Sequence, residues 1–254
     1  MIDINTLDER GLCQLFDHTY LKAYAVREDF VRLCTEAKEN HFRMVAINSY
    51  PVALCKELLQ GSNVHVGAAI SFPLGQMSIE GKCAETKIAI RDGADEIDYV
   101  VNIGKVKEHD YDYIAEEMKQ IVKICHDSNV LIKVIFENCY LEKDEIEELC
   151  HISGKIKPDF IKTSTGFGTY GARVEDVALM KSIVKDEVKV KAAGGIRDWE
   201  TCKKMILAGA ERIGTSASLQ ILEEFKKSHN GYGYGFSIGR TSSFLASSAS
   251  KEEM

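Results

Sequence analysis

Two lysines end short apolar segments in the second half of the chain. Lys162 lies in FIKTSTG and Lys191 lies in VKAAGG. If both segments are neighbouring buried strands, the two side chains meet in an apolar setting, where a cation is costly. A second ammonium nearby lowers the pKa of the first and leaves some free amine to attack a carbonyl carbon. The pair therefore indicates nucleophilic catalysis by a lysine, unless the strands are read one register wrong and the lysines lie on the surface.

An aspartate in a third apolar segment could serve the same site. Asp98 in EIDYVV shares strand parity with Glu96, while Tyr99 points the other way. A carboxylate beside lysines can act as a general acid or base during carbon–carbon cleavage. It could also form a structural ion pair with Lys133 or Lys191, and the two roles are compatible.

Three glycine-containing segments follow the last three apolar runs: TSTG at 163–166, AGG at 193–195 and GTS at 214–216. Glycines let backbone N–H groups approach an anion, and the loops after strands seven and eight are the usual phosphate site of a barrel enzyme. Each segment alone could be an ordinary turn. Together, and in this order, they predict a phosphate site.

The elements that must position these residues alternate along the chain. Short β-branched runs, typical of strands buried in a parallel sheet, occupy residues 16–21, 43–48, 64–72, 96–103, 130–137, 159–164, 188–194 and 211–216. Amphipathic segments such as 77–92, 111–127 and 141–155 lie between them. Eight strand–helix units predict an α/β protein with a single (β/α)₈ (TIM) barrel. An open doubly wound sheet is the alternative, but no GxGxxG follows the first strand.

The site of such a barrel lies where its strands end. The polar residues that close the apolar runs are Asp17, Asn48, Ser71, Asp98 with Asn102, Glu137, Lys162, Lys191 and Ser216.

We expect one domain over residues 1–227, with a short N-terminal helix. Residues 228–254 are dense in glycine and serine, and we expect a flexible tail there. The eight cysteines include no CxxC or other close pair, so we expect reduced thiols and a cytoplasmic protein.

Composition excludes several function classes. The formal net charge of -7 disfavours nucleic acid or an anionic membrane as a partner, and no apolar stretch is long enough to span a bilayer. The seven histidines are scattered without metal-ligand spacing, so we expect no metal and no cofactor. Neither a Cys–His pair nor GxSxG supports a hydrolase.

The combination of ADEID, KTSTGF and KAAGGIR in this order resembles the deoxyribose-phosphate aldolase family of class I aldolases. The resemblance extends from DHTYLK at 17–22 to RIGTS at 212–216. It implies that Lys162 forms a Schiff base, that Lys191 tunes it and that Asp98 handles protons, with Asp17 and Lys133 as secondary residues. The implied phosphate site comprises Thr165, Gly166, Gly194, Gly195, Gly214 and Ser216.

The implied reaction is the reversible aldol cleavage of 2-deoxy-D-ribose 5-phosphate to D-glyceraldehyde 3-phosphate and acetaldehyde. Apart from the resemblance, we expect a homodimer, since a two-fold dimer is the commonest assembly of soluble enzymes. Two departures from the family pattern concern the site. Asn48 stands where many relatives have a cysteine, and Tyr232 or Tyr234 would have to replace a C-terminal tyrosine. A Schiff-base aldolase of another phosphorylated aldehyde or ketone, or an inactive barrel acting as a binding protein, are the alternatives.

Overall fold

Eight parallel strands form a closed barrel in the computed structural model, which describes residues 2–230. The strands are β1 Phe16–Thr19, β2 Met44–Asn48, β3 His65–Ile70, β4 Glu96–Val100, β5 Leu131–Ile135, β6 Phe160–Lys162, β7 Lys189–Ala193 and β8 Arg212–Thr215. They follow one another in chain order, and β8 pairs with β1 through Ile213 and Phe16 to close the ring. The predicted TIM barrel is confirmed, and the open sheet is wrong.

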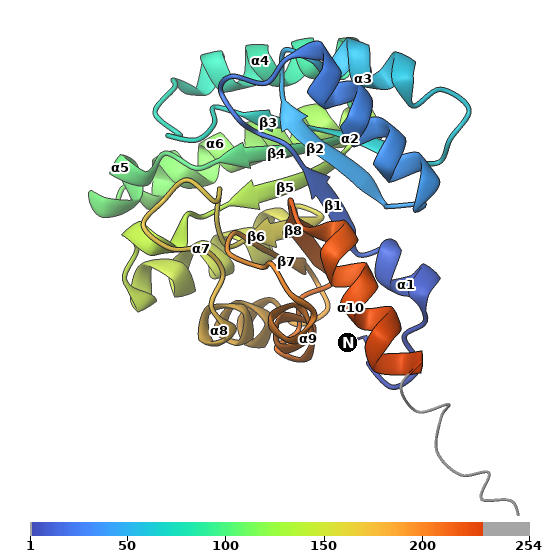
Figure 1. The fold of residues 1–254 in the computed structure, drawn as a ribbon. Helices are drawn as coiled ribbons and strands as arrows, with labels where there is room; N and C mark the ends of the chain where they lie inside the picture. The colour runs from blue at the N-terminus through green and yellow to red at the C-terminus, as the bar shows by residue number, and fades with distance from the viewer. Residues whose placement is uncertain (1, 231–254) are drawn as a thin grey trace, which may run out of the picture.

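Helices surround the strands on the outside of the barrel (Figure 1). They are α1 Glu9–Cys13, α2 Arg27–Glu39, α3 Val52–Leu58, α4 Ile79–Arg91, α5 Ile103–Lys107, α6 Tyr111–Asp127, the 3₁₀ helix η1 Asn138–Tyr140, α7 Lys143–Ile156, α8 Val174–Val184, α9 Trp199–Leu207 and α10 Ser218–Asn230. The predicted short N-terminal helix is α1. Between residues 2 and 230, none of the helices combines the length and apolar character needed to cross a bilayer.

The last helix reaches beyond the predicted domain boundary. Helix α10 runs to Asn230 and so includes the first three residues of the expected tail at 228–254. The remainder of that segment, with Tyr232 and Tyr234, lies outside the described residues.

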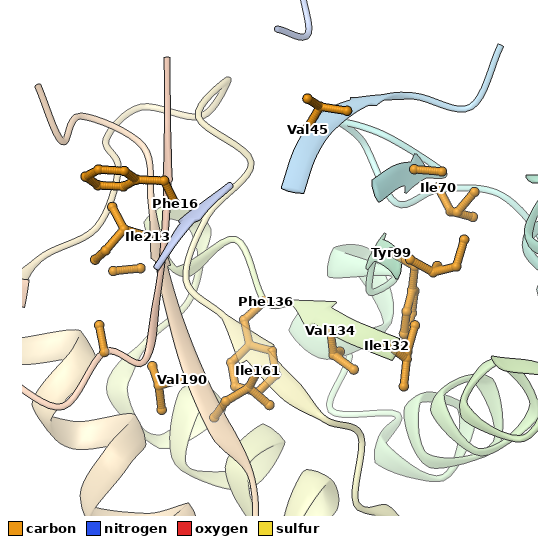
Figure 2. Packing of buried hydrophobic residues seen from close by; sticks show 14 of the residues in the cluster. Phe16, Val45, Ile70, Tyr99, Ile132, Val134, Phe136, Ile161, Val190 and Ile213 are labelled. Atoms are coloured by element: carbon orange, nitrogen blue, oxygen red, sulfur yellow. The ribbon is translucent and has the colours of Figure 1, made fainter. Parts of the chain in front are cut away.

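Successive residues of each strand face two different buried regions, one beneath the helices and one inside the barrel. Outward-facing side chains such as Phe16, Tyr99, Ile161 and Val190 pack beneath the helices in one buried apolar cluster (Figure 2). Their neighbours along the chain point into the barrel, because successive strand residues face opposite sides. Many of those inward side chains are charged.

A buried ion pair between two helices holds the end of β4. Lys82 of α4 donates to Oε2 of Glu117 in α6 at 2.6 Å and to the carbonyl of Val100 at 2.8 Å. The other oxygen of Glu117 accepts from the backbone N–H of Asn102 at 3.2 Å. Both charged side chains are fully buried. The pair therefore fixes the backbone just beyond Asp98.

We predict that Lys82→Met lowers the free energy of unfolding by about 3–5 kcal/mol, because it leaves the buried Glu117 carboxylate without its partner. The matched control is Lys123→Met, which breaks an exposed pair with Asp127 on α6 and should cost less than about 1 kcal/mol. Urea unfolding of both variants measures the difference. Equal, small effects would contradict a structural role for the pair.

Candidate active site

Lys162 and Lys191 lie next to each other inside the barrel. The register of β6 and β7 sets the two residues opposite one another, and both side chains are buried. One oxygen of Asp98, Oδ2, accepts hydrogen bonds from Lys162 Nζ at 2.9 Å and Lys191 Nζ at 2.7 Å. The alternative that these lysines lie on the surface in a shifted register is therefore wrong.

The second oxygen of Asp98 binds a third lysine. Lys133 stands opposite Asp98 in the register of β4 and β5, and its Nζ donates to Oδ1 at 2.7 Å. Lys133 also lies 2.5 Å from Oε2 of Glu96. Glu96 and Asp98 thus share the inner face of β4, while Tyr99 packs outward, as strand parity predicts. The structural ion pairs of Asp98 with Lys133 and Lys191 both exist.

Asp17 and Arg212 complete the network on the side of β1 and β8. Asp17 Oδ2 lies 2.5 Å from Lys191 Nζ, and Asp17 Oδ1 accepts from Arg212 Nη1 at 2.6 Å. Arg212 Nη1 also lies 3.2 Å from Glu96 Oε2. Asp17 is 4.0 Å from Lys133. The two secondary residues named from the sequence, Asp17 and Lys133, therefore belong to the same network as the three principal ones.

The electrostatic setting lowers the pKa of Lys162. Burial lowers its pKa to about 8; the Asp98 carboxylate opposes that shift, and the ammonium groups of Lys191 and Lys133 add to it. Of the two causes expected from the sequence, burial in an apolar setting and repulsion from a second lysine, burial is the larger. With this pKa, about a tenth of Lys162 is free amine at pH 7, far more than for a lysine of ordinary pKa.

Asp98 stays ionised. Burial alone would raise its pKa, but the charges of Lys133, Lys162 and Lys191 outweigh burial and hold the pKa well below its ordinary value. Asp98 is therefore a fixed anion that organises the lysines, and any proton it takes from one of them passes on readily.

A cavity of about 740 Å³ opens at the end of the barrel where the strands finish. Lys162 lines this cavity, whereas Asp98, Lys133 and Lys191 are buried behind it. On β2 the lining residue is Ala46, and Asn48 is not part of the wall. Lys162 is thus the member of the network that a small molecule in the cavity would meet.

The predicted phosphate residues all line this cavity. Its lining includes Thr165, Gly166, Gly194, Gly195, Gly214 and Ser216. Gly194 has a φ of 86°, and a Cβ there would lie 2.9 Å from Gly171 Cα, so glycine is required. Ser216 lies two residues before Ser218, the first residue of α10, whose N-terminal N–H groups and helix dipole favour an anion.

Gly214 has a second role that its motif did not suggest. A Cβ at this position would lie 3.0 Å from Cε of Lys191 and 2.9 Å from Cβ of Ala193. The absence of a side chain therefore makes room for the stem of Lys191 on its way to Asp98.

The hydroxyl of Thr165 already forms hydrogen bonds within the protein. It donates to Oε2 of Glu137, whose Oε1 accepts from the Thr165 N–H at 3.1 Å, and it accepts from the N–H of Phe167 at 3.0 Å. Burial raises the pKa of Glu137, and the hydrogen bonds from Thr165 oppose that shift. Thr165 and Glu137 thus hold the loop after Lys162 in place.

Two further residues of the cavity wall were not singled out from the sequence. Arg197 follows the paired glycines, is exposed and lines the cavity. His18 is buried in the wall, with Nε2 2.7 Å from Glu36 and Nδ1 3.0 Å from Ser218, the first residue of α10. Burial lowers the pKa of His18, whereas the hydrogen bond and charge of Glu36 oppose that shift. Arginine three positions after Ala-Gly could have indicated a phosphate ligand, whereas the His18 contacts need the three-dimensional fold.

No group of three or more His, Cys, Asp or Glu side chains within residues 2–230 is arranged to hold a metal ion.

Comparisons with known proteins agree with this geometry. Residues 8–243 match the model of the DeoC/LacD family aldolases. The deoxyribose-phosphate aldolase of Lactobacillus acidophilus is 57% identical over 87% of this chain and 92% of its own, and that of Thermococcus kodakarensis is 47% identical over 85% and 98%. Among solved structures, the deoxyribose phosphate aldolase of Aeropyrum pernix matches with a TM-score of 0.81 and 31% identity, over 87% of this chain and 93% of its own. The chain belongs to the DeoC/LacD family of aldolases.

Proposed function

We propose that this protein cleaves 2-deoxy-D-ribose 5-phosphate reversibly to D-glyceraldehyde 3-phosphate and acetaldehyde through a Schiff base on Lys162. The observation that carries the proposal is a buried lysine with a pKa of about 8 at the wall of a cavity that the glycine-containing loops after β6, β7 and β8 also line. The relatives named above are deoxyribose-phosphate aldolases, which indicates the substrate.

The free amine of Lys162 attacks C1 of the open-chain sugar, and loss of water gives a protonated imine. The C3 hydroxyl then loses its proton, the electrons of the C2–C3 bond move toward the imine nitrogen, and C3 becomes the aldehyde of glyceraldehyde 3-phosphate. The enamine that remains takes a proton at C2, and hydrolysis releases acetaldehyde and the amine.

We assign the proton transfers to Asp98, Lys191 and an ordered water acting together. Asp98 Oδ2 contacts both Lys162 Nζ and Lys191 Nζ, so a proton can pass between the two amines across one oxygen. Because the two amines and the carboxylate interact strongly, their proton equilibria belong to the group rather than to one residue. Asp17 and Lys133 orient the group from behind.

The phosphate group would lie against the glycines at 194–195 and the start of α10, with Arg197 as its cation. Within residues 2–230 the Arg197 guanidinium has no ion-pair partner, so it is available to a ligand. Phosphate held there leaves the other end of the sugar toward Lys162.

The alternatives differ in substrate or in activity. A Schiff-base aldolase of another phosphorylated aldehyde or ketone would use the same lysine, and comparing cleavage of deoxyribose 5-phosphate with that of fructose phosphates separates them. An inactive binding protein is disfavoured because Lys162, Lys191 and Asp98 retain a complete hydrogen-bonded arrangement.

We further propose that the protein is a homodimer in the cytoplasm. Tyr24, Tyr50 and Leu74, on the loops after β1, β2 and β3, are exposed apolar side chains that a second copy would cover. All eight cysteines are free thiols, which suits a reducing compartment. Light scattering should give twice the chain mass of 28.4 kDa; a monomer mass, or the tetramer described for the Aeropyrum pernix relative, would contradict the dimer.

We predict that Lys162→Met lowers kcat for cleavage of deoxyribose 5-phosphate at least about 10³-fold, because the nucleophile is removed while the stem keeps its packing. Lys123→Met, on the exposed face of α6, is the matched control and should keep wild-type cleavage. A coupled assay for glyceraldehyde 3-phosphate measures both. Wild-type activity in the Lys162 variant would show that another group forms the intermediate.

We predict that Arg197→Ala raises KM for deoxyribose 5-phosphate roughly 10- to 100-fold, the value of one or two hydrogen bonds to a charged group. Cleavage of unphosphorylated 2-deoxyribose should not change, since it has no phosphate to lose. Arg91→Ala, an exposed arginine on α4, controls for the loss of one charge. If the variant affects both substrates equally, Arg197 does not bind phosphate.

A further inference from the structure

The ion-pair network inside the barrel contains unequal numbers of positive and negative groups. Its carboxylates are Asp17, Glu96 and Asp98, and its cations are Lys133, Lys162, Lys191 and Arg212. All of these side chains are buried. One cation therefore has no matching negative charge if every group is ionised, and a buried excess charge is relieved by loss of a proton.

The contacts decide which cation gives up its proton. Lys191 contacts Asp17 and Asp98, Arg212 contacts Asp17 and Glu96, and Lys133 contacts all three carboxylates. Within residues 2–230, the only carboxylate that Lys162 contacts is Asp98. Lys162 is thus the most weakly held cation in the network, and Arg212 cannot deprotonate in its place.

We propose that Arg212 and Glu96, which do not line the substrate cavity, set the fraction of free amine at Lys162 by fixing the charge balance of the barrel interior. With Arg212 the network has four cations for three carboxylates, so one lysine ammonium has no matching negative charge. Glu96 keeps the excess of positive charge at one, because without its carboxylate the excess would be two. Both are positioning residues, since they act on Lys162 through Asp17, Lys133 and Asp98. This proposal rests on the proposed function in one respect: there the free amine of Lys162 is the nucleophile that forms the Schiff base.

The location of Arg212 supports an electrostatic role. It borders a separate cavity lined by residues at the starts of the strands, including Arg43 and Phe160, and its guanidinium lies 5.1 Å from the Phe160 ring. Arg212 is therefore remote from a substrate bound beside Lys162. Any effect of its charge on Lys162 must pass through the shared carboxylates or through space.

Other charged groups face this network at its two ends. Glu96 also contacts His65 Nδ1 at 2.8 Å and Arg43 Nε at 3.8 Å, and both of these side chains are partly exposed to water. At the cavity end, Glu137 is close enough for Lys162 to influence its pKa, but its carboxylate is bound by Thr165. His65, Arg43 and Glu137 are not substituted in the variants below.

Three variants test the inference: Arg212→Met, Glu96→Gln and the double variant, which removes one charge of each sign. Competitive labelling with trace acetic anhydride, read by mass spectrometry, gives the pH midpoint of Lys162 without any need for aldolase activity. The wild-type midpoint should lie near 8. Arg212→Met should move it to higher pH by about one unit, Glu96→Gln should move it to lower pH, and the double variant should return close to wild type. The acid limb of kcat/KM for deoxyribose 5-phosphate should move in parallel.

A purely structural role predicts different results. In that case the single variants lose stability or kcat while the Lys162 midpoint stays in place, or both midpoints move in one direction, and either result overturns the inference. If Arg212→Met does not fold, Glu96→Gln and the charge-balanced double variant still decide the question, because their midpoints must differ. Midpoints that move as predicted in proteins that do not cleave deoxyribose 5-phosphate would refute the proposed function and leave this inference standing.

Discussion

Asp98 binds three lysine ammonium groups inside a closed barrel, and the rest of the site depends on that contact. Removing a charge from water costs several kcal/mol per ion, whereas one ion pair at about 4 Å returns roughly 4 kcal/mol at the effective dielectric of such sites. A buried cation with two or three carboxylate neighbours can therefore remain charged. For a cation with one such neighbour the two contributions nearly cancel, and in the described part of the chain Lys162 has only Asp98 as a carboxylate neighbour.

The barrel architecture makes this arrangement possible. Each strand places apolar residues such as Ile161 and Val190 beneath the helices and charged residues such as Lys162 and Lys191 in the centre. Because the outer cluster supplies the apolar burial, the inner face can hold charges. Glycines fit the same plan: Gly214 leaves room for the stem of Lys191, and Gly194 brings backbone donors to the cavity.

Periodicity and residue type were enough to predict the barrel, the inward direction of Lys162, Lys191 and Asp98, and the glycine segments that line the cavity. They were not enough to reveal Arg212 as a member of the network. Its partners Asp17 and Glu96 are 195 and 116 positions away, and nothing local to RIGTS distinguishes a lumen arginine from a surface one.

The other omissions have the same origin. Lys82 and Glu117 look like ordinary charges on amphipathic helices, yet they are fully buried and bind the backbone beyond β4. Thr165 was predicted to bind phosphate from its motif, but the motif could not show that Glu137 takes its hydroxyl. Sequence pattern gives the face on which a side chain lies, and only the folded chain gives its partner.

The central claim is that one particular amine of the network becomes covalent. The direct measurement is borohydride reduction of the wild-type protein in the presence of deoxyribose 5-phosphate, followed by digestion and mapping of the added mass. The account predicts a single adduct on the peptide that contains Lys162, with Lys133 and Lys191 unmodified. An adduct on either of those lysines, or continued cleavage with no adduct at all, would contradict it.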